Sequence, residues 1–273
     1  MIKKCLFPVA GYGSRFLPAS KAIPKEMFPI VTKPLIQYGV QEAKNAGCNN
    51  ISMVTSKYKK AIEDHFDTNI DISNAVNGSS KEELLSDINN IIDTTSFSFT
   101  RQPEMKGLGD AILCGQALIG DEPFAVILPD DLCYNDGDDV LTQMTDLYKK
   151  YPNHCIVAIE EIPMEHTNKY GVISGDEIEK NIFKIDNMVE KPESKDAPSN
   201  LAIIGRYILI PEIFDIIKNT PAGKGGEIQI TDALLTLAKQ GKVLAYKFQG
   251  RRFDCGSVDG FIEATNFFYN LEY

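Results

Sequence analysis

The order of apolar and polar positions predicts alternating strands and helices over about the first 160 residues. Unbroken apolar runs of four to seven residues are typical of parallel strands that are covered on both faces. Such runs predict strands at Lys3–Val9, Asn50–Thr55, Phe97–Arg101, Phe124–Leu128 and Cys155–Ile159. Helical spacing of apolar residues predicts helices at Leu35–Ala46, Lys57–Phe66, Lys81–Ile92, Asp110–Ile119 and Val140–Lys150. This alternation indicates a doubly wound α/β fold with a mostly parallel sheet.

The pattern changes after residue 160, where the apolar runs are shorter and are separated by turns. Strands are expected at Tyr170–Ile173, Ile182–Val189, Leu201–Leu209 and Val243–Phe248, and helices at Pro211–Lys218, Thr231–Lys239 and Val258–Tyr269. No low-complexity linker separates the two halves, so we expect one domain over residues 1–273. Its second half, about 161–273, is expected to cover one side of the first half, about 1–160.

The first predicted strand leads into a loop that has the features of a phosphate-binding site. Gly11 and Gly13 follow the apolar run, and glycine-bearing loops offer backbone N–H groups to anions. Between Gly11 and Pro34 the chain carries one acid, Glu26, and four cations, Arg15, Lys21, Lys25 and Lys33. A local positive site in a chain of net charge −10 indicates a small polyanion as the ligand.

Three well-known phosphate loops do not match this segment. The dinucleotide fingerprint G-x-G-x-x-G requires a third glycine, and Phe16 stands in its place. The Walker A ending G-K-[ST] and the kinase signatures H-R-D and D-F-G are missing from the sequence. A nicotinamide-dependent oxidoreductase is therefore disfavoured, although a simple tight turn remains an alternative for the glycines.

Composition and charge narrow the possible partners and location. The acidic balance argues against binding to nucleic acid or to anionic lipid, and no apolar run is long enough to span a membrane. Six scattered cysteines form no C-x-x-C pair, which indicates a reducing cytoplasm rather than a disulfide framework or a structural zinc. With three separated histidines, a histidine-based metal site or catalytic triad is also disfavoured.

Carboxylates that follow two of the predicted strands are candidates for binding a metal. Asp130 and Asp131 follow the strand that ends near Leu128, and ligands of open α/β sheets bind at the carboxyl ends of strands. Mg²⁺ favours one or two carboxylates together with substrate phosphates. Asp254 is the second strand-end acid. For each of these residues a turn or helix cap is the alternative.

Three further positions combine suitable side chains with a strand end or a glycine turn. Gln102 ends a strand, and its amide can pair with the imide edge of uracil or thymine, or with cytosine if it is flipped. Gly107 lies close behind it and could let backbone approach a base. Glu190 and Lys191 precede a proline that prevents a central strand from continuing, and they suit a sugar hydroxyl and a phosphate. The alternatives are a surface polar residue for Gln102 and an exposed ion pair for Glu190 and Lys191. Residues 225–232 look like a loop and a helix cap, and no chemistry is assigned to them.

In their order along the chain, these motifs resemble the bacterial UTP–glucose-1-phosphate uridylyltransferases. The resemblance runs nearly end to end through GYGSRFLP and PKEM, KPLIQY, KGLGDA, EPFAVILPDD, KYGVI, VEKP, APSNLAIIGRYIL, GEIQITDAL and FDCGS. The chain departs from the commoner pattern at Val9, Ser14 and Asp110, where many members have Ala, Thr and His. The fold implied is a Rossmann-like nucleotidyltransferase fold with a smaller sugar-binding subregion.

The resemblance also implies a reaction, a cofactor and residue roles. UTP and α-D-glucose 1-phosphate would give UDP-glucose and pyrophosphate by direct in-line attack on the α-phosphorus, with Mg²⁺, in a homo-oligomer that is a tetramer or a dimer. A sister enzyme that uses dTTP or another sugar phosphate, and a non-catalytic sugar-nucleotide-binding regulator, are the alternatives. The implied roles are catalysis by Arg15, Lys25 and Lys191, nucleotide binding by Ala10, Gly11, Gly13, Ser14, Gln102 and Gly107, sugar binding by Gly171, Glu190 and Lys191, and metal binding by Asp130 and Asp254.

Overall fold

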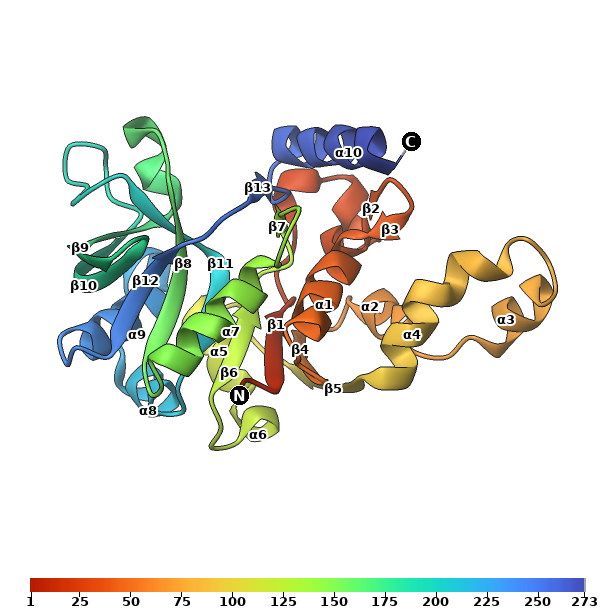
Figure 1. The fold of residues 1–273 in the computed structure, drawn as a ribbon, viewed down its shortest axis with the longest axis horizontal. Helices are drawn as coiled ribbons and strands as arrows, with labels where there is room; N and C mark the ends of the chain where they lie inside the picture. The colour runs from red at the N-terminus through yellow and green to blue at the C-terminus, as the bar shows by residue number, and fades with distance from the viewer. Residues whose placement is uncertain (273) are drawn as a thin grey trace.

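A mixed nine-stranded sheet forms the centre of the protein in a computed structural model that describes residues 1–272 (Figure 1). The last residue of the predicted domain, 273, lies outside the described residues. The strand order is β5-β4-β1-β6-β11-β8-β12-β10-β9. These strands are β1 (Lys4–Pro8), β4 (Asn50–Thr55), β5 (Ser96–Arg101), β6 (Phe124–Ile127), β8 (Cys155–Glu161), β9 (Gly171–Glu179), β10 (Ile182–Glu190), β11 (Leu201–Leu209) and β12 (Val243–Lys247).

The first half of the sheet is parallel, as the sequence predicts. Strand β1 pairs in parallel with both β4 and β6, and β4 pairs in parallel with β5. The apolar side chains of β1, β4 and β6 are buried, because helices cover the sheet, whereas Phe99 of the edge strand β5 is exposed. The α-helices are α1 (Leu35–Asn45), α2 (Lys60–His65), α3 (Ile70–Val76), α4 (Ser86–Thr94), α5 (Leu108–Cys114), α6 (Gln116–Ile119), α7 (Val140–Lys150), α8 (Glu212–Asn219), α9 (Ile230–Ala238) and α10 (Val258–Glu272).

The prediction of a mostly parallel, doubly wound sheet is wrong for the second half. Strand β11 runs antiparallel to β6 and β8, and β10 runs antiparallel to β12 and β9. A two-residue turn joins β9 to β10, with Asn181 at φ 66°, and so short a connection permits only antiparallel pairing. The start of β9 also pairs with β11, so the strands β11, β8, β12, β10 and β9 form a closed ring. The second half therefore extends the sheet and does not cover one side of it.

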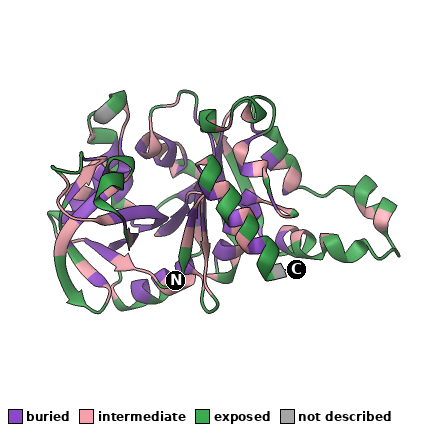
Figure 2. Ribbon diagram, turned by 90° about the horizontal axis from the view of Figure 1, so that it is seen from above, coloured by how far each residue is buried: buried purple, intermediate pink, exposed green. Residues whose placement is uncertain are grey.

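Two helical predictions also differ from the structure. The helix expected at Asp110–Ile119 is divided at Gly115 into α5 and α6. Gly115 packs so closely on Leu6 that a Cβ there would come within 2.6 Å of it. The helix expected at Lys81–Ile92 is a 3₁₀ turn, Glu82–Leu85, followed by α4. Helix α3 has no counterpart in the predictions. Helices α3 and α4 project from the body as an arm that is largely exposed (Figures 1 and 2).

Two small antiparallel sheets lie above the main sheet, under the last helix. Strand β7 (Asp131–Tyr134) pairs with β13 (Arg251–Asp254), and β2 (Pro29–Ile30) pairs with β3 (Lys33–Pro34). Helix α10 covers both and closes a second apolar core that includes Phe253 and Phe268 (Figure 1). The register of the first pair sets Asp254 opposite Asp131. This ribbon brings the end of the chain to the end of β6.

A buried ion pair joins the elements around that point. The Arg206 side chain on β11 is 1% exposed and donates from Nε and Nη2 to the Glu42 carboxylate on α1, at 2.7–3.1 Å. Its Nη1 donates to the Asp131 carbonyl oxygen at 2.6 Å and to that of Leu128 at 3.3 Å. Glu42 Oε1 also accepts from the backbone N–H of Leu141. One guanidinium thus holds the turn after β6 against β11 and α1.

We expect Arg206→Met to lower the free energy of unfolding by about 3–5 kcal/mol, because Glu42 is then left buried without a counter-charge. Urea unfolding followed by circular dichroism measures this. The double variant Glu42→Leu/Arg206→Met should recover part of the loss, since the uncompensated charge is removed. As a matched control, Asp215→Asn breaks an exposed ion pair with Lys218 and should change the free energy by less than about 1 kcal/mol. An equally small effect of Arg206→Met would contradict the role of this ion pair.

Candidate active site

Two adjoining cavities lie at the carboxyl ends of the parallel strands. The smaller, of about 360 Å³, lies against the phosphate loop after β1, and the larger, of about 630 Å³, lies toward the ring of strands in the second half. Asp130, which follows β6, lines both cavities. Glu227 also lines both, so the arrangement provides two compartments that share two carboxylates.

The smaller cavity brings together most of the residues predicted to bind a nucleotide. Its lining includes Ala10, Gly11, Lys25, Gln102 and Gly107. Ala10 and Gly11 follow β1, Gln102 and Gly107 follow β5, and Lys25 begins a 3₁₀ turn in between. The parallel strands β1 and β5 end at the same edge of the sheet, which brings these segments together.

Gly13 and Ser14 line neither cavity. Gly13 has φ 66°, and a Cβ there would lie 3.3 Å from the Lys25 side chain. Because residue 13 has no side chain, the Lys25 side chain can pass close to the backbone there. Ser14 lies exposed in a 3₁₀ turn, Ser14–Phe16. Of the other cations, Lys33 lies 3.0 Å from Asp87, in an exposed ion pair outside both cavities.

An ion pair between Lys25 and Asp130 lies at the border of the two cavities. Lys25 Nζ is 2.5 Å from Asp130 Oδ2. Burial alone would lower the pKa of Lys25, but the charges of Asp130 and Glu26 raise it above its ordinary value. Burial would likewise raise the pKa of Asp130, but Lys25, with Arg15 beyond it, lowers it. Both groups are therefore charged near neutral pH.

The loop that carries Lys25 is held by a second ion pair, which sequence reasoning missed. Glu26 and Lys59 are both almost fully buried, and Lys59 Nζ donates to Glu26 Oε2 at 2.7 Å. Burial raises the pKa of Glu26 and lowers that of Lys59. The two residues are 33 positions apart in the sequence, so no local pattern pairs them.

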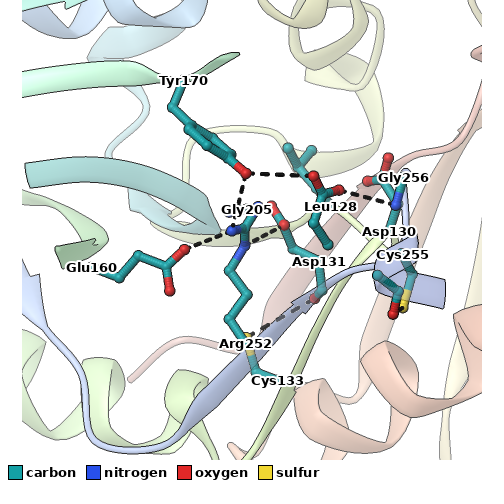
Figure 3. A network of polar contacts seen from close by, with 12 residues as sticks. Leu128, Asp130, Asp131, Cys133, Glu160, Tyr170, Gly205, Arg252, Cys255 and Gly256 are labelled. Atoms are coloured by element: carbon teal, nitrogen blue, oxygen red, sulfur yellow. Dashed lines mark hydrogen bonds and ion pairs between the residues drawn. The ribbon is translucent and has the colours of Figure 1, made fainter. Parts of the chain in front are cut away.

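The two neighbouring aspartates have different surroundings. Asp131 accepts from Arg252 Nε at 2.5 Å and from the backbone N–H of Gly205 at 2.8 Å, and burial raises its pKa. Arg252 also donates from Nη1 to Glu160 at 2.6 Å and to the Tyr170 hydroxyl at 3.4 Å, as Figure 3 shows. Asp131 is thus occupied by structural partners and lines only the larger cavity, whereas Asp130 lines both.

Asp254 completes a site with two carboxylates around Gly256. A Cβ on Gly256 would lie 3.0 Å from an oxygen of Asp130, 3.0 Å from an oxygen of Asp254 and 3.3 Å from Arg15 Nη1. Asp254 also accepts from the backbone N–H of Gly256 and from the Tyr170 hydroxyl. Both carboxylates therefore face one small volume that a side chain at residue 256 would fill. No group of three His, Cys, Asp or Glu side chains suited to a metal occurs within residues 1–272.

This donor set fits a divalent metal ion that takes its remaining ligands from phosphates and water. The β7–β13 register, which sets Asp254 opposite Asp131, brings Asp254 close to Asp130. Lys25 Nζ contacts Asp130 Oδ2 in this structure, so a metal ion bound at this site would share that carboxylate with the lysine.

The larger cavity contains the residues predicted to bind a sugar. Gly171, Glu190 and Lys191 line it, as does Arg15. The Glu190 carboxylate accepts from Thr231 Oγ1 at 2.6 Å and lies 3.2 Å from Lys191 Nζ. A Cβ on Gly171 would lie 2.9 Å from that threonine oxygen, so the glycine keeps this wall open.

Several residues of this cavity had no predicted role. Glu227, Gln229 and Thr231 belong to the segment that sequence analysis interpreted as a loop and a cap, yet all three line the larger cavity. Thr231 lies in the first turn of α9, and the partner of its hydroxyl, Glu190, is 41 residues away. A threonine at a helix start is usually a cap, and only the folded chain shows this one bound to a carboxylate.

The chain matches known proteins over its whole length. The sequence model of a family described as nucleotidyl transferase matches residues 8–270. The chain belongs to this family. This confirms the resemblance that the ordered motifs indicated.

The most similar curated relatives include a UTP–glucose-1-phosphate uridylyltransferase of Pseudomonas aeruginosa. It is 62% identical over 100% of this chain and 98% of its own length. A protein of the same name from Bacillus subtilis is 45% identical over 97% of this chain and 90% of its own length. A solved UDP-glucose pyrophosphorylase in complex with UDP-glucose is 57% identical, with a TM-score of 0.93 and full coverage of both chains. An apo form of such an enzyme, at 58% identity, superposes with a TM-score of 0.97, also over the full length of both chains.

Gly256→Ala should reduce nucleotidyl transfer by about 10²-fold, because its methyl group would separate the two carboxylates that meet there. The melting temperature should change little, since no backbone strain is expected at this position. Steady-state kinetics and thermal unfolding measure the two effects. Gly137→Ala is the matched control, since its added Cβ would meet nothing closer than 3.4 Å. Full activity of Gly256→Ala would show that this volume takes no part in the reaction.

Proposed function

We propose that this protein converts UTP and α-D-glucose 1-phosphate into UDP-glucose and pyrophosphate. The observation that carries the proposal is the pair of cavities joined at Asp130, with a base-reading amide, Gln102, in one and a hydroxyl-binding carboxylate, Glu190, in the other. The names of the relatives at 45–62% identity support the same substrates. Production of UDP-glucose that depends on both substrates, followed by release of pyrophosphate, tests the proposal.

Different residues bind the two substrates. Gln102 and Gly107 bind the uracil, while Ala10 and Gly11 hold the rest of the nucleotide from the phosphate loop. Gly13 and Ser14, which line neither cavity, contribute only through the shape of that loop. Gly171 and Glu190 orient the glucose in the larger cavity.

The cations account for the chemistry of the transfer. Arg15 and Lys25 neutralise the phosphates of UTP, and Lys191 holds the phosphate of the sugar. An oxygen of that phosphate then attacks the α-phosphorus in line, and pyrophosphate leaves from the opposite side. Such a transfer depends on positioning and charge neutralisation and needs no protein nucleophile.

We infer that Asp130 and Asp254 hold Mg²⁺ when the substrates are bound. The ion would supply charge neutralisation at the phosphates. The support is the convergence of the two carboxylates at Gly256, together with the lowered pKa of Asp130, which keeps that ligand ionised.

The main alternative is a sister enzyme that uses dTTP or a different sugar phosphate. One solved structure similar to this chain is named a putative glucose-1-phosphate thymidylyltransferase from Bacillus anthracis, but at 21% identity and a TM-score of 0.75 it shares the fold alone. A panel of UTP, dTTP, CTP and GTP with several sugar phosphates distinguishes these enzymes. A sugar-nucleotide-binding regulator would show no turnover with any of them.

We also propose that the protein acts in the cytoplasm as a homo-oligomer, a tetramer or dimer, built from one domain over residues 1–273. No helix within residues 1–272 has the length and apolar character to cross a membrane. Light scattering coupled to gel filtration measures the oligomeric state. Nucleic acid is not among the proposed partners, because the chain has a net charge of −10.

Asp130→Asn should nearly abolish turnover at ordinary Mg²⁺ concentrations while the fold remains intact. The variant loses one charge from the proposed metal site and the counter-charge of Lys25 at the same time. Kinetics over a range of Mg²⁺ concentrations should show a raised requirement for the ion. Asp146→Asn, on the exposed face of α7, is the matched control and should behave as the wild type. Near-normal activity of Asp130→Asn would refute the assignment.

Lys191→Ala should lower turnover by about 10²–10³-fold, comparable to the loss of one preorganised electrostatic contact. Residue 191 has φ 47°, and alanine keeps the Cβ, so the backbone strain is the same in both proteins and the change reports the side chain. Calorimetry should find UTP binding without sugar unchanged. The control is Lys195→Ala, an exposed lysine four residues away.

Lys191→Arg should also lose most activity, because a planar guanidinium does not replace a compact ammonium. A Lys191→Ala variant that loses UTP affinity but keeps its KM for glucose 1-phosphate would place the lysine with the wrong substrate.

A further inference from the structure

Gln102 can bind a base in either of two orientations of its side-chain amide. With Oε1 toward the base, the amide accepts from the N3–H of uracil. With Nε2 toward the base, it donates to the N3 of cytosine, which is an acceptor. The orientation of this one amide therefore decides which pyrimidine fits.

The surroundings of Gln102 distinguish the two orientations. Its Nε2 donates to Asp110 Oδ2 at 2.7 Å and to the Gly107 carbonyl oxygen at 3.2 Å. A flipped amide would set Oε1 against these two acceptors, one of them a carboxylate. Gln102 is 5% exposed, so little water can relieve that repulsion.

The other end of the amide is available to a ligand. Within residues 1–272, no donor is paired with Gln102 Oε1, and the one buried side-chain polar atom left without a partner is Thr95 Oγ1. Since Gln102 lines the smaller cavity, its Oε1 is open to that cavity as an acceptor.

The loop that carries Asp110 is fixed independently of Gln102. Gly109 N–H donates to the Ile228 carbonyl oxygen at 2.9 Å, and Ile228 N–H donates to the Lys106 carbonyl oxygen at 2.8 Å. A Cβ on Gly107 or Gly109 would come within 2.9 Å of the backbone at Ile228, so the two strands of chain are in close contact. Asp110 follows directly in the first turn of α5 and cannot easily move away.

We propose that Asp110 is a positioning residue that locks the Gln102 amide with its oxygen toward the base, and so makes the site select uracil over cytosine. Asp110 acts through Gln102 and need not touch the nucleotide. The inference rests on the proposed function, because it concerns the nucleotide used by that reaction.

The test compares UTP with CTP as substrates of wild type and Asp110→Asn. An asparagine can turn its own amide and donate to a flipped Gln102, so the lock is released. The ratio of kcat/KM for UTP to that for CTP should fall by about tenfold, the difference between a charged and a neutral partner for one buried hydrogen bond. Asp110→Ala should lower the same ratio. The ratio does not depend on the fraction of folded enzyme, so reduced stability of a variant does not obscure it.

Two controls separate this role from a general effect of charge or packing. Glu104→Gln removes the same unit of charge from the same loop, but Glu104 pairs with Lys106 and not with Gln102. Its ratio should stay within about twofold of the wild type. In a Gln102→Ala background, Asp110→Asn should change the ratio by no more than about twofold, because the residue through which it acts is gone.

The outcomes distinguish the inference from the proposed function. Wild-type enzyme that makes no UDP-glucose from UTP would overturn the function. Wild-type enzyme that prefers UTP, together with an Asp110→Asn variant of unchanged ratio, would overturn the inference alone. An equal effect of Asp110→Asn with and without Gln102 would also overturn it. Calorimetry with UTP and CTP in the absence of sugar should show the same change as a ratio of dissociation constants.

Discussion

The Arg206 guanidinium is the contact on which the geometry of the candidate site depends. It is buried between α1, β11 and the turn after β6, and it compensates Glu42 while it fixes the carbonyl oxygens of Leu128 and Asp131. Asp130 lies inside that turn. Burying a charged pair in a core costs desolvation free energy. Here the pair fixes the position of the turn that carries Asp130, which lines both cavities.

Much of the first half could be predicted because its signals are local. Continuous apolar runs and the glycine loop after β1 are features of neighbouring residues, and they predict Gly11, Gln102 and Asp130 at strand ends, which meet at one edge of the sheet. The order of motifs added the substrates and the roles of Glu190 and Lys191. Gly13 and Ser14 were also predicted to bind the nucleotide, but they line neither cavity. A loop motif does not show which of its residues face the ligand.

What could not be predicted depends on pairings across long stretches of sequence. The short turn at Asn181 accounts for the antiparallel pairing of β9 with β10, but β11 pairs antiparallel with β6, β8 and β9, and its apolar run looks the same in either direction. The contacts of Thr231 with Glu190, of Lys59 with Glu26 and of Arg252 with Asp131 join residues 33 to 121 positions apart. Each polar side chain alone is better explained as a cap or an exposed charge, so only the fold shows its partner.

The β7–β13 ribbon under α10 has a consequence for the order in which the protein is made. The phosphate loop and Asp130 lie in the first half of the chain, and the parallel strands that hold them can pair while translation continues. Asp254 is carried by β13, which needs α10 to cover its apolar face. The nucleotide cavity is nevertheless completed late, because Arg206, which fixes the turn of Asp130, and Glu227, which lines the cavity, belong to the second half. Asp254 reaches Asp130 only after residues 251–272 have left the ribosome.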